Sequence, residues 1–126
     1  MTLHFLENGS GQPLILLHGL FGSLDNLGVI NRDLQQDFHT IAMDLPDHGK
    51  SPWSDHFNYQ DYANAVIQQM DELNLSQAAF MGHSMGGKVA MHIALNHPQR
   101  VSKLIVADIA PVIYSWIKIN CDSPNA

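Results

Sequence analysis

Short apolar runs alternate with amphipathic segments along most of this chain, and this pattern limits the folds that it can adopt. Each run is continuous and ends at turn residues, which is typical of strands buried on both faces of a sheet. The alternation predicts an α/β fold, with a mostly parallel sheet and helices on both faces. The runs are LILLHG (14–19), HTIAMD (39–44), QAAFMGH (77–83) and KLIVADI (103–109), and LHFLEN (3–8) is expected to add an antiparallel edge strand.

Helical periodicity is clearest from Tyr59 to Leu73, where Asn58 is placed to cap the first turn. A second helix is expected over 24–36 with Ser23 as its N-cap, and a third follows Ser84 and ends before residue 98, a proline. The side chains expected to face the core are Tyr59, Tyr62, Ala63, Val66, Ile67, Met70 and Leu73 in the first helix, Leu24, Leu27, Ile30 and Leu34 in the second, and Val89, Ala90, Ile93 and Ala94 in the third.

Composition narrows the class of partner. The 126 residues are enough for one domain, and 45% hydrophobic with 14% charged residues is an ordinary globular balance. A net charge of -6 disfavours nucleic acid and anionic membranes, so a small molecule is the expected partner. Cys121 is the single cysteine, and the sequence has neither a leader pattern nor an apolar run of membrane-spanning length. We therefore expect a cytoplasmic protein.

Three motifs fall at the carboxyl ends of the predicted strands, where α/β sheets gather their ligands. They are His18-Gly19, DLPDHGKS (44–51) and GHSMG (82–86). A bare G-x-S-x-G would arise by chance in roughly 4% of chains of this length. Its position between a strand and a helix makes it far more specific, because a nucleophile elbow needs small residues around the serine and Gly82, Gly86 and Gly87 supply them.

Taken together, these motifs resemble the α/β-hydrolase superfamily, and within it the small bacterial esterases of the YbfF type. The resemblance rests on LLHGLFGSLDNLG (16–28), DLPDHGKS, GHSMGG (82–87) and ADIAPV (107–112), which occur in the same order and at similar spacing. It covers the chain to about Tyr114. Pro46 departs from the pattern, because relatives usually place arginine or another polar residue there.

The resemblance implies a serine ester hydrolase that acts on acyl esters or thioesters and needs no cofactor. Ser84 would attack the acyl carbon, and two backbone N–H groups would bind the oxyanion. The N–H of Met85 is one of them, and the N–H of Leu20 is the other, with Phe21 as the alternative. The expected turn supports are His18, Gly19, Gly82, His83 and Gly86. The competing interpretation makes Ser84 only a small residue in a strand-helix turn.

The triad acid is expected at Asp108, which follows an apolar strand at the same sheet edge as Ser84. A carboxylate between Ala107 and Ile109 is costly unless an imidazolium or another group pairs with it. The alternative is that Asp108 caps the following turn. Asp44 also ends a strand, but the resemblance makes it a loop-organising residue.

No histidine follows Asp108, although the triad of this fold runs in the order serine, acid, histidine. His92 would lie about 12 Å along the helix from Ser84, His97 lies further along, and His83 should point to the other face of its strand. The resemblance implies that His18 and His48 hold turns, with an approach of either one to the site as the alternative. The remaining histidines, His4, His39 and His56, show no metal-ligand spacing, so no metal site is expected.

These observations divide the chain into 1–114, the N-terminal part of an α/β-hydrolase domain, and 115–126, a divergent tail. The change of character after Tyr114 suggests a truncated, frame-shifted or fragmentary form, which comparison of the coding DNA in three frames would test. The strand that ends at Asp108 would then be an open edge, and self-association through it is expected. A catalytically silent binding module, or a C–C hydrolase or haloperoxidase with the same triad, remains the alternative function.

Overall fold

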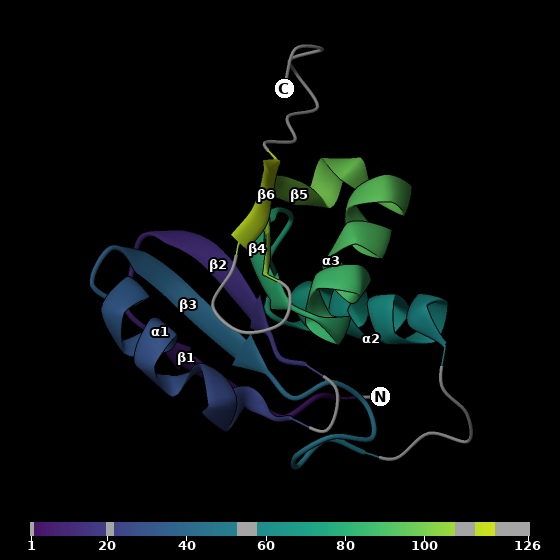
Figure 1. The fold of residues 1–126 in the computed structure, drawn as a ribbon, viewed down its shortest axis with the longest axis horizontal. Helices are drawn as coiled ribbons and strands as arrows, with labels where there is room; N and C mark the ends of the chain where they lie inside the picture. The colour runs from purple at the N-terminus through teal and green to yellow at the C-terminus, as the bar shows by residue number, and fades with distance from the viewer. Residues whose placement is uncertain (1, 20–21, 53–57, 108–112, 118–126) are drawn as a thin grey trace.

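The computed structural model describes residues 2–19, 22–52, 58–107 and 113–117 (Figure 1). Its centre is a six-stranded sheet with the order β1-β3-β2-β4-β5-β6. The strands are β1 Phe5–Asn8, β2 Gln12–Leu17, β3 Phe38–Met43, β4 Ala78–His83, β5 Val101–Ala107 and β6 Ile113–Ile117. The helices are η1 Leu24–Leu27, α1 Gly28–Leu34, α2 Tyr59–Glu72, α3 Met85–Asn96 and η2 Pro98–Arg100.

The central strands are parallel, as the alternation of strands and helices predicts. β2 pairs with β3 on one side and with β4 on the other, and β4 pairs with β5. β1 adds to β3 as the antiparallel edge strand expected from LHFLEN. The four predicted strands are therefore confirmed, and their carboxyl ends meet at one edge of the sheet. Only β2 and β3 are buried over most of their length, because β4 alternates between buried and half-buried residues and β5 exposes Lys103.

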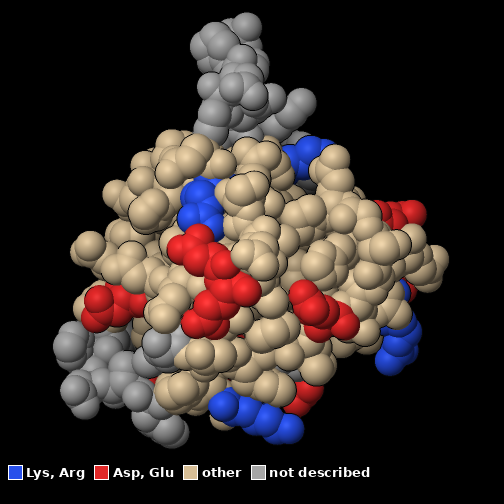
Figure 2. All heavy atoms as spheres, turned by 180° about the vertical axis from the view of Figure 1, so that it is seen from behind, with Lys and Arg blue, Asp and Glu red and all other residues tan. Residues whose placement is uncertain are grey.

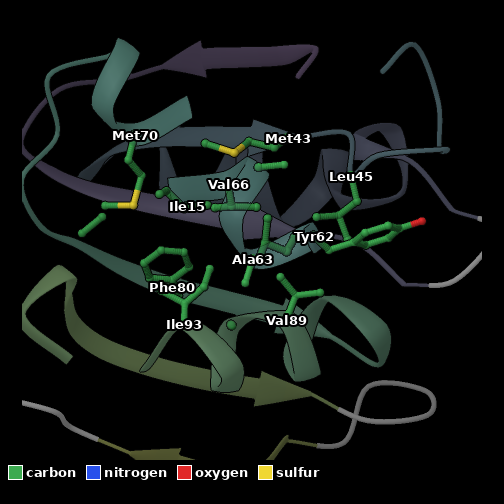
Figure 3. Packing of buried hydrophobic residues seen from close by; sticks show 14 of the residues in the cluster. Ile15, Met43, Leu45, Tyr62, Ala63, Val66, Met70, Phe80, Val89 and Ile93 are labelled. Atoms are coloured by element: carbon green, nitrogen blue, oxygen red, sulfur yellow. The ribbon is translucent and has the colours of Figure 1, made fainter. Parts of the chain in front are cut away.

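The two faces of the sheet are covered unequally. α2 and α3 lie on one face, and η1 with α1 lies on the other (Figure 1). Figure 3 shows side chains from β2, β3 and β4 meeting those of α2 and α3 in the larger core. Alternation along β2 explains the division, because Ile15 and Leu17 join the larger core while Leu14 and Leu16 face η1 and α1.

Helices α2 and α3 follow the sequence pattern closely. Asn58 caps α2 by accepting a hydrogen bond from the Asp61 N–H at 2.7 Å. The predicted inward side chains of both helices are buried or pack against the core, which confirms the two stripes. Each large apolar side chain that is fully buried here contributes about 2 kcal/mol of burial free energy.

The stripe predicted for residues 24–36 is wrong at Ile30, which is 42% exposed, whereas Asn31 is buried. The segment begins as the 3-10 helix η1, capped by Ser23 as expected, and becomes α-helical only at Gly28. A 3-10 turn advances each residue by about 120° instead of 100°, so the following side chains are rotated out of the uniform helical phase. Asn31 accepts a hydrogen bond from the Thr40 hydroxyl in the core.

The outer side of β5 is not an open edge, contrary to the sequence-based expectation. β6 pairs with it antiparallel, with Ile105 opposite Trp116 and Val106 opposite Ser115. The backbone groups of β5 therefore find partners within the chain, and β6 takes the last position in the described sheet. β6 runs through residue 114 into the segment predicted as a divergent tail. Self-association through a sheet edge stays a prediction, and it now concerns β6.

Surface charge and helix length add two observations. On the face shown in Figure 2 the basic side chains lie apart from one another among acidic and uncharged residues. That face therefore offers no broad basic area of the kind that polyanions bind. Within the residues that the structure describes, no helix is both long enough and apolar enough to cross a membrane.

Candidate active site

Ser84 lies at a sharp turn between β4 and α3. Its backbone has φ 53° and ψ -112°, a conformation that L residues rarely adopt. The Ser84 N–H donates to the Ala107 carbonyl at 2.8 Å, and the Ser84 carbonyl accepts from the Lys88 N–H at 3.1 Å. The turn is thus tied to β5 on one side and to the first turn of α3 on the other.

Close backbone packing explains why the elbow needs glycine. A Cβ atom on Gly82 would lie 2.4 Å from the Gly86 carbonyl oxygen, and one on Gly86 would lie 2.4 Å from the Leu17 carbonyl oxygen. A Cβ on Gly87 would lie 2.8 Å from the Val106 side chain. The missing side chains let α3 begin directly against the ends of β2 and β4. This packing places the N–H of Met85, the first residue of α3, at the carboxyl edge of the sheet.

The carbonyl oxygen of Gly19 accepts the hydrogen bonds that hold the turn after β2. This oxygen accepts from the Gly22 N–H at 3.0 Å and from the His18 imidazole at 2.7 Å. A Cβ on Gly22 would lie 2.7 Å from the Asn26 amide oxygen, so the Asn26 side chain would have to shift to admit it. Leu20 and Phe21, the predicted sources of the second oxyanion donor, occupy the middle of this turn in sequence and lie outside the described residues.

Both ring nitrogens of His18 are hydrogen-bonded. Its Nε2 accepts from the Leu45 N–H at 3.0 Å, and therefore the proton of the neutral ring is on Nδ1, which donates to the Gly19 carbonyl. Burial lowers the pKa of His18, the Gly19 carbonyl opposes this shift, His48 adds to it, and Asp44 opposes it. These two bonds connect the ring to the turn after β2 and to the loop after β3, and they leave no free ring nitrogen with which His18 could act as a general base. The predicted role of His18 as a turn support stays a prediction.

The loop after β3 is held by a buried carboxylate. Asp44 accepts from the Lys50 N–H at 2.9 Å through its side chain, and its carbonyl accepts from the Ser51 hydroxyl at 2.6 Å. Gly49 lies against this carboxylate with φ +52°, a conformation that glycine adopts without strain. These contacts agree with the loop-organising role predicted for Asp44.

His48 and Tyr62 extend this loop toward α2. The His48 Nδ1 donates to the Pro46 carbonyl at 2.9 Å, and its ring centroid lies 5.1 Å from that of His18. The Tyr62 hydroxyl donates to the Asp47 carboxylate at 2.7 Å. Burial, together with this hydrogen bond and the negative charge of Asp47, raises the pKa of Tyr62 far above its ordinary range. A polar connection therefore runs from α2 to the loop after β3.

Asp108 lies outside the described residues, so its role as the triad acid stays a prediction. The strand before it is described, and Ala107 is paired with His83, the residue before Ser84. The sheet register therefore brings position 107 close to the turn that holds Ser84. Asp108 is the next residue in the sequence.

The other histidines separate into different parts of the molecule. The His83 ring lies against Gly19, because a Cβ on that glycine would be 2.9 Å from the His83 Nδ1. His92 is within α3 and His97 follows its last residue. His39 pairs with Glu7 across β1 and β3 at 3.2 Å. Among the described residues no cluster of acidic, histidine or cysteine side chains could hold a metal ion.

A shallow surface hollow lies at the opposite ends of the strands from Ser84. Its centre is Arg100, which donates to the Asp71 carboxylate at 2.7 Å and to the carbonyls of Ser76 and Leu75. These bonds join the end of α2 to the start of β5. The hollow is therefore a structural junction and contributes nothing to the site. Its lining residues are Asp71, Asn74, Leu75, Ser76, Gln77, Gln99 and Arg100.

Sequence reasoning missed the contacts that connect the loops to one another. One such contact is the hydrogen bond from the Leu45 N–H to the His18 ring, and another is the bond from the Tyr62 hydroxyl to Asp47. Each joins segments that lie far apart in the chain. No local periodicity signals such a pair. The available signal was the concentration of polar residues in 44–51 directly after an apolar strand.

This parallel sheet with a strained serine elbow defines a class of protein, and comparison with known sequences gives the same class. The sequence profile of the family described as alpha/beta hydrolase fold matches residues 12–121. The chain belongs to the α/β-hydrolase family, in agreement with the resemblance seen in its motifs.

Individual relatives are hydrolases by name. The esterase YbfF of Escherichia coli (strain K12) is 45% identical over 105 residues, covering 83% of this chain and 41% of that protein. The sn-1-specific diacylglycerol lipase ABHD11 of Danio rerio is 39% identical over 113 residues, covering 88% of this chain and 36% of that protein. A solved structure described as a marine microorganism esterase matches with a TM-score of 0.84 and 43% identity, over 98% of this chain and 46% of that one. The chain thus spans less than half the length of these relatives.

Proposed function

We propose that this chain carries the nucleophile of a serine carboxylic-ester hydrolase that acts on acyl esters or thioesters through an acyl-enzyme. The observation that carries this proposal is the backbone of Ser84, with φ 53° and ψ -112° between β4 and α3. Such a conformation costs about 1–3 kcal/mol and is retained where a side chain must stand out of a turn. The esterase and lipase names of the relatives support the same reaction class.

The proposed reaction proceeds in two stages. The Ser84 hydroxyl oxygen bonds to the acyl carbon, its proton passes to a base, and the carbonyl oxygen becomes an oxyanion. The oxyanion accepts hydrogen bonds from the N–H of Met85 and of Leu20; losing one such donor typically costs about 3 kcal/mol in the transition state. Collapse of this intermediate expels the alcohol or thiol, which takes the proton. Water then repeats the sequence on the acyl-enzyme and frees Ser84.

The general base that would accept the Ser84 proton is the one catalytic group without an assigned residue. Every histidine of the chain precedes Asp108, and the His18 nitrogens are both engaged. His48 is the resident candidate, because its ring is near the turn and only its Nδ1 is used by the Pro46 carbonyl. The other source is a histidine from a polypeptide segment outside this chain. Asp108 is the proposed acid in either case.

Hydrolysis of p-nitrophenyl acetate and butyrate by the purified chain tests the proposal. Ser84→Ala is the matched control, with circular dichroism and thermal unfolding on both proteins. We expect a rate that Ser84→Ala abolishes, and His48→Ala then decides whether the base is resident. Equal background rates for the two folded proteins would overturn the proposed activity for this chain.

A second candidate is a silent binding module that keeps the elbow as scaffold, and the engagement of both His18 ring nitrogens by backbone groups favours it. A fluorophosphonate probe, which bonds covalently to activated serines, separates the two. Labelling that is lost in Ser84→Ala supports the hydrolase. A folded chain that is never labelled, and that still binds an acyl ester in calorimetry, supports the binding module.

A further inference from the structure

We propose that Asn8 is a site of spontaneous deamidation, in which the backbone nitrogen of Gly9 attacks the side-chain amide of Asn8. This inference is independent of the proposed function, because neither residue belongs to the candidate active site. Both lie at the edge of the sheet, where β1 ends and the chain turns toward β2 (Figure 1). The sequence contains one Asn-Gly pair, and it stands at positions 8 and 9.

The side chain of Asn8 is free to react. Asn8 is the last residue of β1, and it is exposed. Its backbone carbonyl accepts a hydrogen bond from the Thr40 hydroxyl at 3.4 Å. Its side-chain amide makes no hydrogen bond to any residue that the structure describes. No bond therefore holds this amide in place, and solvent can receive the ammonia that the reaction releases.

The backbone N–H of Gly9 points away from β3. The Asp44 N–H donates to the His4 carbonyl at 2.8 Å, so these two residues form a hydrogen-bonded pair of the antiparallel ladder. Bonded and non-bonded pairs alternate, and the register continues to Asn8 opposite Thr40, which is again a bonded pair. The Asn8 carbonyl therefore faces β3, and in a trans peptide the next N–H faces the opposite way. The attacking nitrogen is thus directed outward from an edge strand.

Packing fixes glycine as the residue that follows Asn8. Gly9 has a φ of +75°, and a Cβ there would lie 2.2 Å from the Phe38 carbonyl oxygen and 2.3 Å from that of Gln35. A residue with a side chain could not take this place unless the backbone moved. The missing side chain also leaves the Gly9 nitrogen open to the Asn8 Cγ. The fold therefore retains a neighbour that exposes this asparagine to attack.

The proposed reaction has two steps. The Gly9 nitrogen bonds to the Asn8 Cγ, the Cγ–Nδ2 bond breaks, and Nδ2 leaves as ammonia with the proton that the Gly9 nitrogen gives up. The product is a five-membered succinimide ring. Water then adds to one of the two ring carbonyls and opens the ring, which leaves either aspartate or isoaspartate at position 8. Attack requires Asn8 to leave its extended conformation, which the end of an edge strand does by local opening.

Asn74 offers a matched comparison within the same chain. It is exposed, and it lies in the turn after α2 with a φ of 59°. The next residue is Leu75, whose N–H donates to the Met70 carbonyl at 2.8 Å and whose side chain is half-buried. The engaged nitrogen and the side chain both oppose attack at this position. Asn74 should therefore keep its amide while Asn8 loses it.

The two products should affect the sheet differently. Aspartate keeps the length of the main chain, whereas isoaspartate adds a methylene group to it just before Gly9. The carbonyl groups of Phe38 and Gln35 lie against Gly9 and leave no space for this extra length. The end of β1 must then separate from β3 around Thr40. Isoaspartate at position 8 would therefore open the β1 edge of the sheet.

Peptide mass spectrometry of aged protein tests the proposal. The folded chain is incubated at mildly alkaline pH and digested, and the deamidated fraction is followed for the peptides of Asn8 and Asn74. The modified peptide is heavier by the difference between one water and one ammonia. We expect Asn8 to react about tenfold faster than Asn74, a barrier difference of about 1.4 kcal/mol. Equal rates at the two asparagines would overturn the proposal.

The same incubation in urea shows whether the fold allows the reaction. We expect Asn8 to lose its amide in the folded chain as well as in the unfolded chain, because both reacting groups face solvent. A folded chain that keeps this amide while the unfolded chain loses it would show that the fold protects the site. That result would overturn the proposal even if Asn74 stayed intact in both samples.

Two variants complete the experiment. Asn8→Gln has a longer side chain, so attack by the Gly9 nitrogen would have to close a less favourable six-membered ring. Isoelectric focusing should show an acidic form that accumulates in the unchanged protein and not in Asn8→Gln; equal accumulation would overturn the assignment to Asn8. Asn8→Asp reproduces the aspartate product. Hydrogen exchange of the Thr40 amide should be faster in the purified isoaspartyl form than in Asn8→Asp, and equal exchange would overturn the predicted opening of β1.

Discussion

The two loops that meet at the carboxyl edge of the sheet hold their shapes by opposite means. In the elbow between β4 and α3, Gly82 and Gly86 have no side chains, and backbones pack where a Cβ on either glycine would overlap them. In the loop after β3, polar side chains such as Asp44 are present and hydrogen-bond to the backbone. The elbow therefore depends on shape, whereas the polar loop depends on donors, acceptors and protonation states.

This difference predicts different responses to substitution and to pH. A steric contact with a backbone atom cannot be relieved by a side-chain rotation, so the elbow should tolerate very little change. A hydrogen bond can be replaced by another polar group of similar length, so the loop should tolerate conservative changes.

The largest effect is expected from Gly86→Ala in the elbow. The new methyl group would lie 2.4 Å from the Leu17 carbonyl oxygen and 2.5 Å from that of His18. We expect the free energy of unfolding to fall by about 3 kcal/mol, measured by urea denaturation. Gly28→Ala is the matched control, because no atom lies within 4 Å of its Cβ position and its φ of -57° suits alanine. It should raise stability by about 0.5 kcal/mol. Equal effects at both glycines would contradict the steric account.

A smaller loss is expected from Asp44→Ala in the polar loop. The substitution leaves the part-buried Lys50 N–H without its acceptor, so we expect a loss of about 1–2 kcal/mol. Asp44→Asn keeps an acceptor oxygen and should lose less. Asp33→Ala, at an exposed position of α1, should stay within about 0.5 kcal/mol of the unchanged protein. If Asp44→Asn lost as much as Asp44→Ala, the carboxylate charge would matter more than the hydrogen bond.

A substitution that breaks the connection between α2 and this loop should lower the free energy of unfolding by less still. Tyr62→Phe removes the hydroxyl that donates to Asp47 and should cost about 1 kcal/mol. A double-mutant cycle with Asp47→Asn measures the coupling, since asparagine also tolerates the φ of 69° at that position. Strictly additive losses would show that the two groups do not interact in solution.

The smallest effect is a pH dependence, which should arise where the His18 ring contacts the polar loop and not in the elbow. Burial holds the His18 pKa below its ordinary 6.5, with His48 and Asp44 as the ionisable neighbours. The unfolded chain therefore takes up a proton at a higher pH than the folded chain does. The stability contribution of His18 is full above pH 6.5 and is lost as pH falls from there toward the folded pKa.

Urea denaturation at pH 7.5 and at pH 5 measures this effect. The unchanged protein should lose more stability between the two values than His18→Asn, which cannot titrate at this position. Gly86→Ala, where the fault is steric, should lose as much as the unchanged protein. Parallel losses in the unchanged protein and in His18→Asn would contradict the assignment of a neutral His18.

The sequence predicts the elements of this fold well because their signals are local. Strand runs and helical stripes depend on residues a few positions apart, and the first five strands, α2 and α3 follow them. The stripe of α1 fails at Ile30 because the segment starts with a 3-10 turn, which a uniform helical period cannot represent. β6 was missed because its pairing with β5 is set by contacts in space, while the sequence after Tyr114 departs from the family pattern.

The candidate site also has one part that the sequence predicts and another part that it does not. The elbow is readable from the sequence, because glycine spacing around Ser84 directly reflects its packing. The two bonds of His18 are not, since one of them reaches Leu45 across 27 positions of the chain. Asp108 and Leu20 keep their predicted roles as hypotheses, because both lie outside the described residues.

The backbone of Ser84 also sets a conflict between activity and selection for stability. Its φ of 53° and ψ of -112° are accessible to glycine without strain. A library screened only for resistance to heat or protease should therefore enrich Ser84→Gly, which relieves the turn and removes the proposed nucleophile. Engineering programmes that stabilise this scaffold would need to hold position 84 constant, because the most stable residue there is one that cannot react.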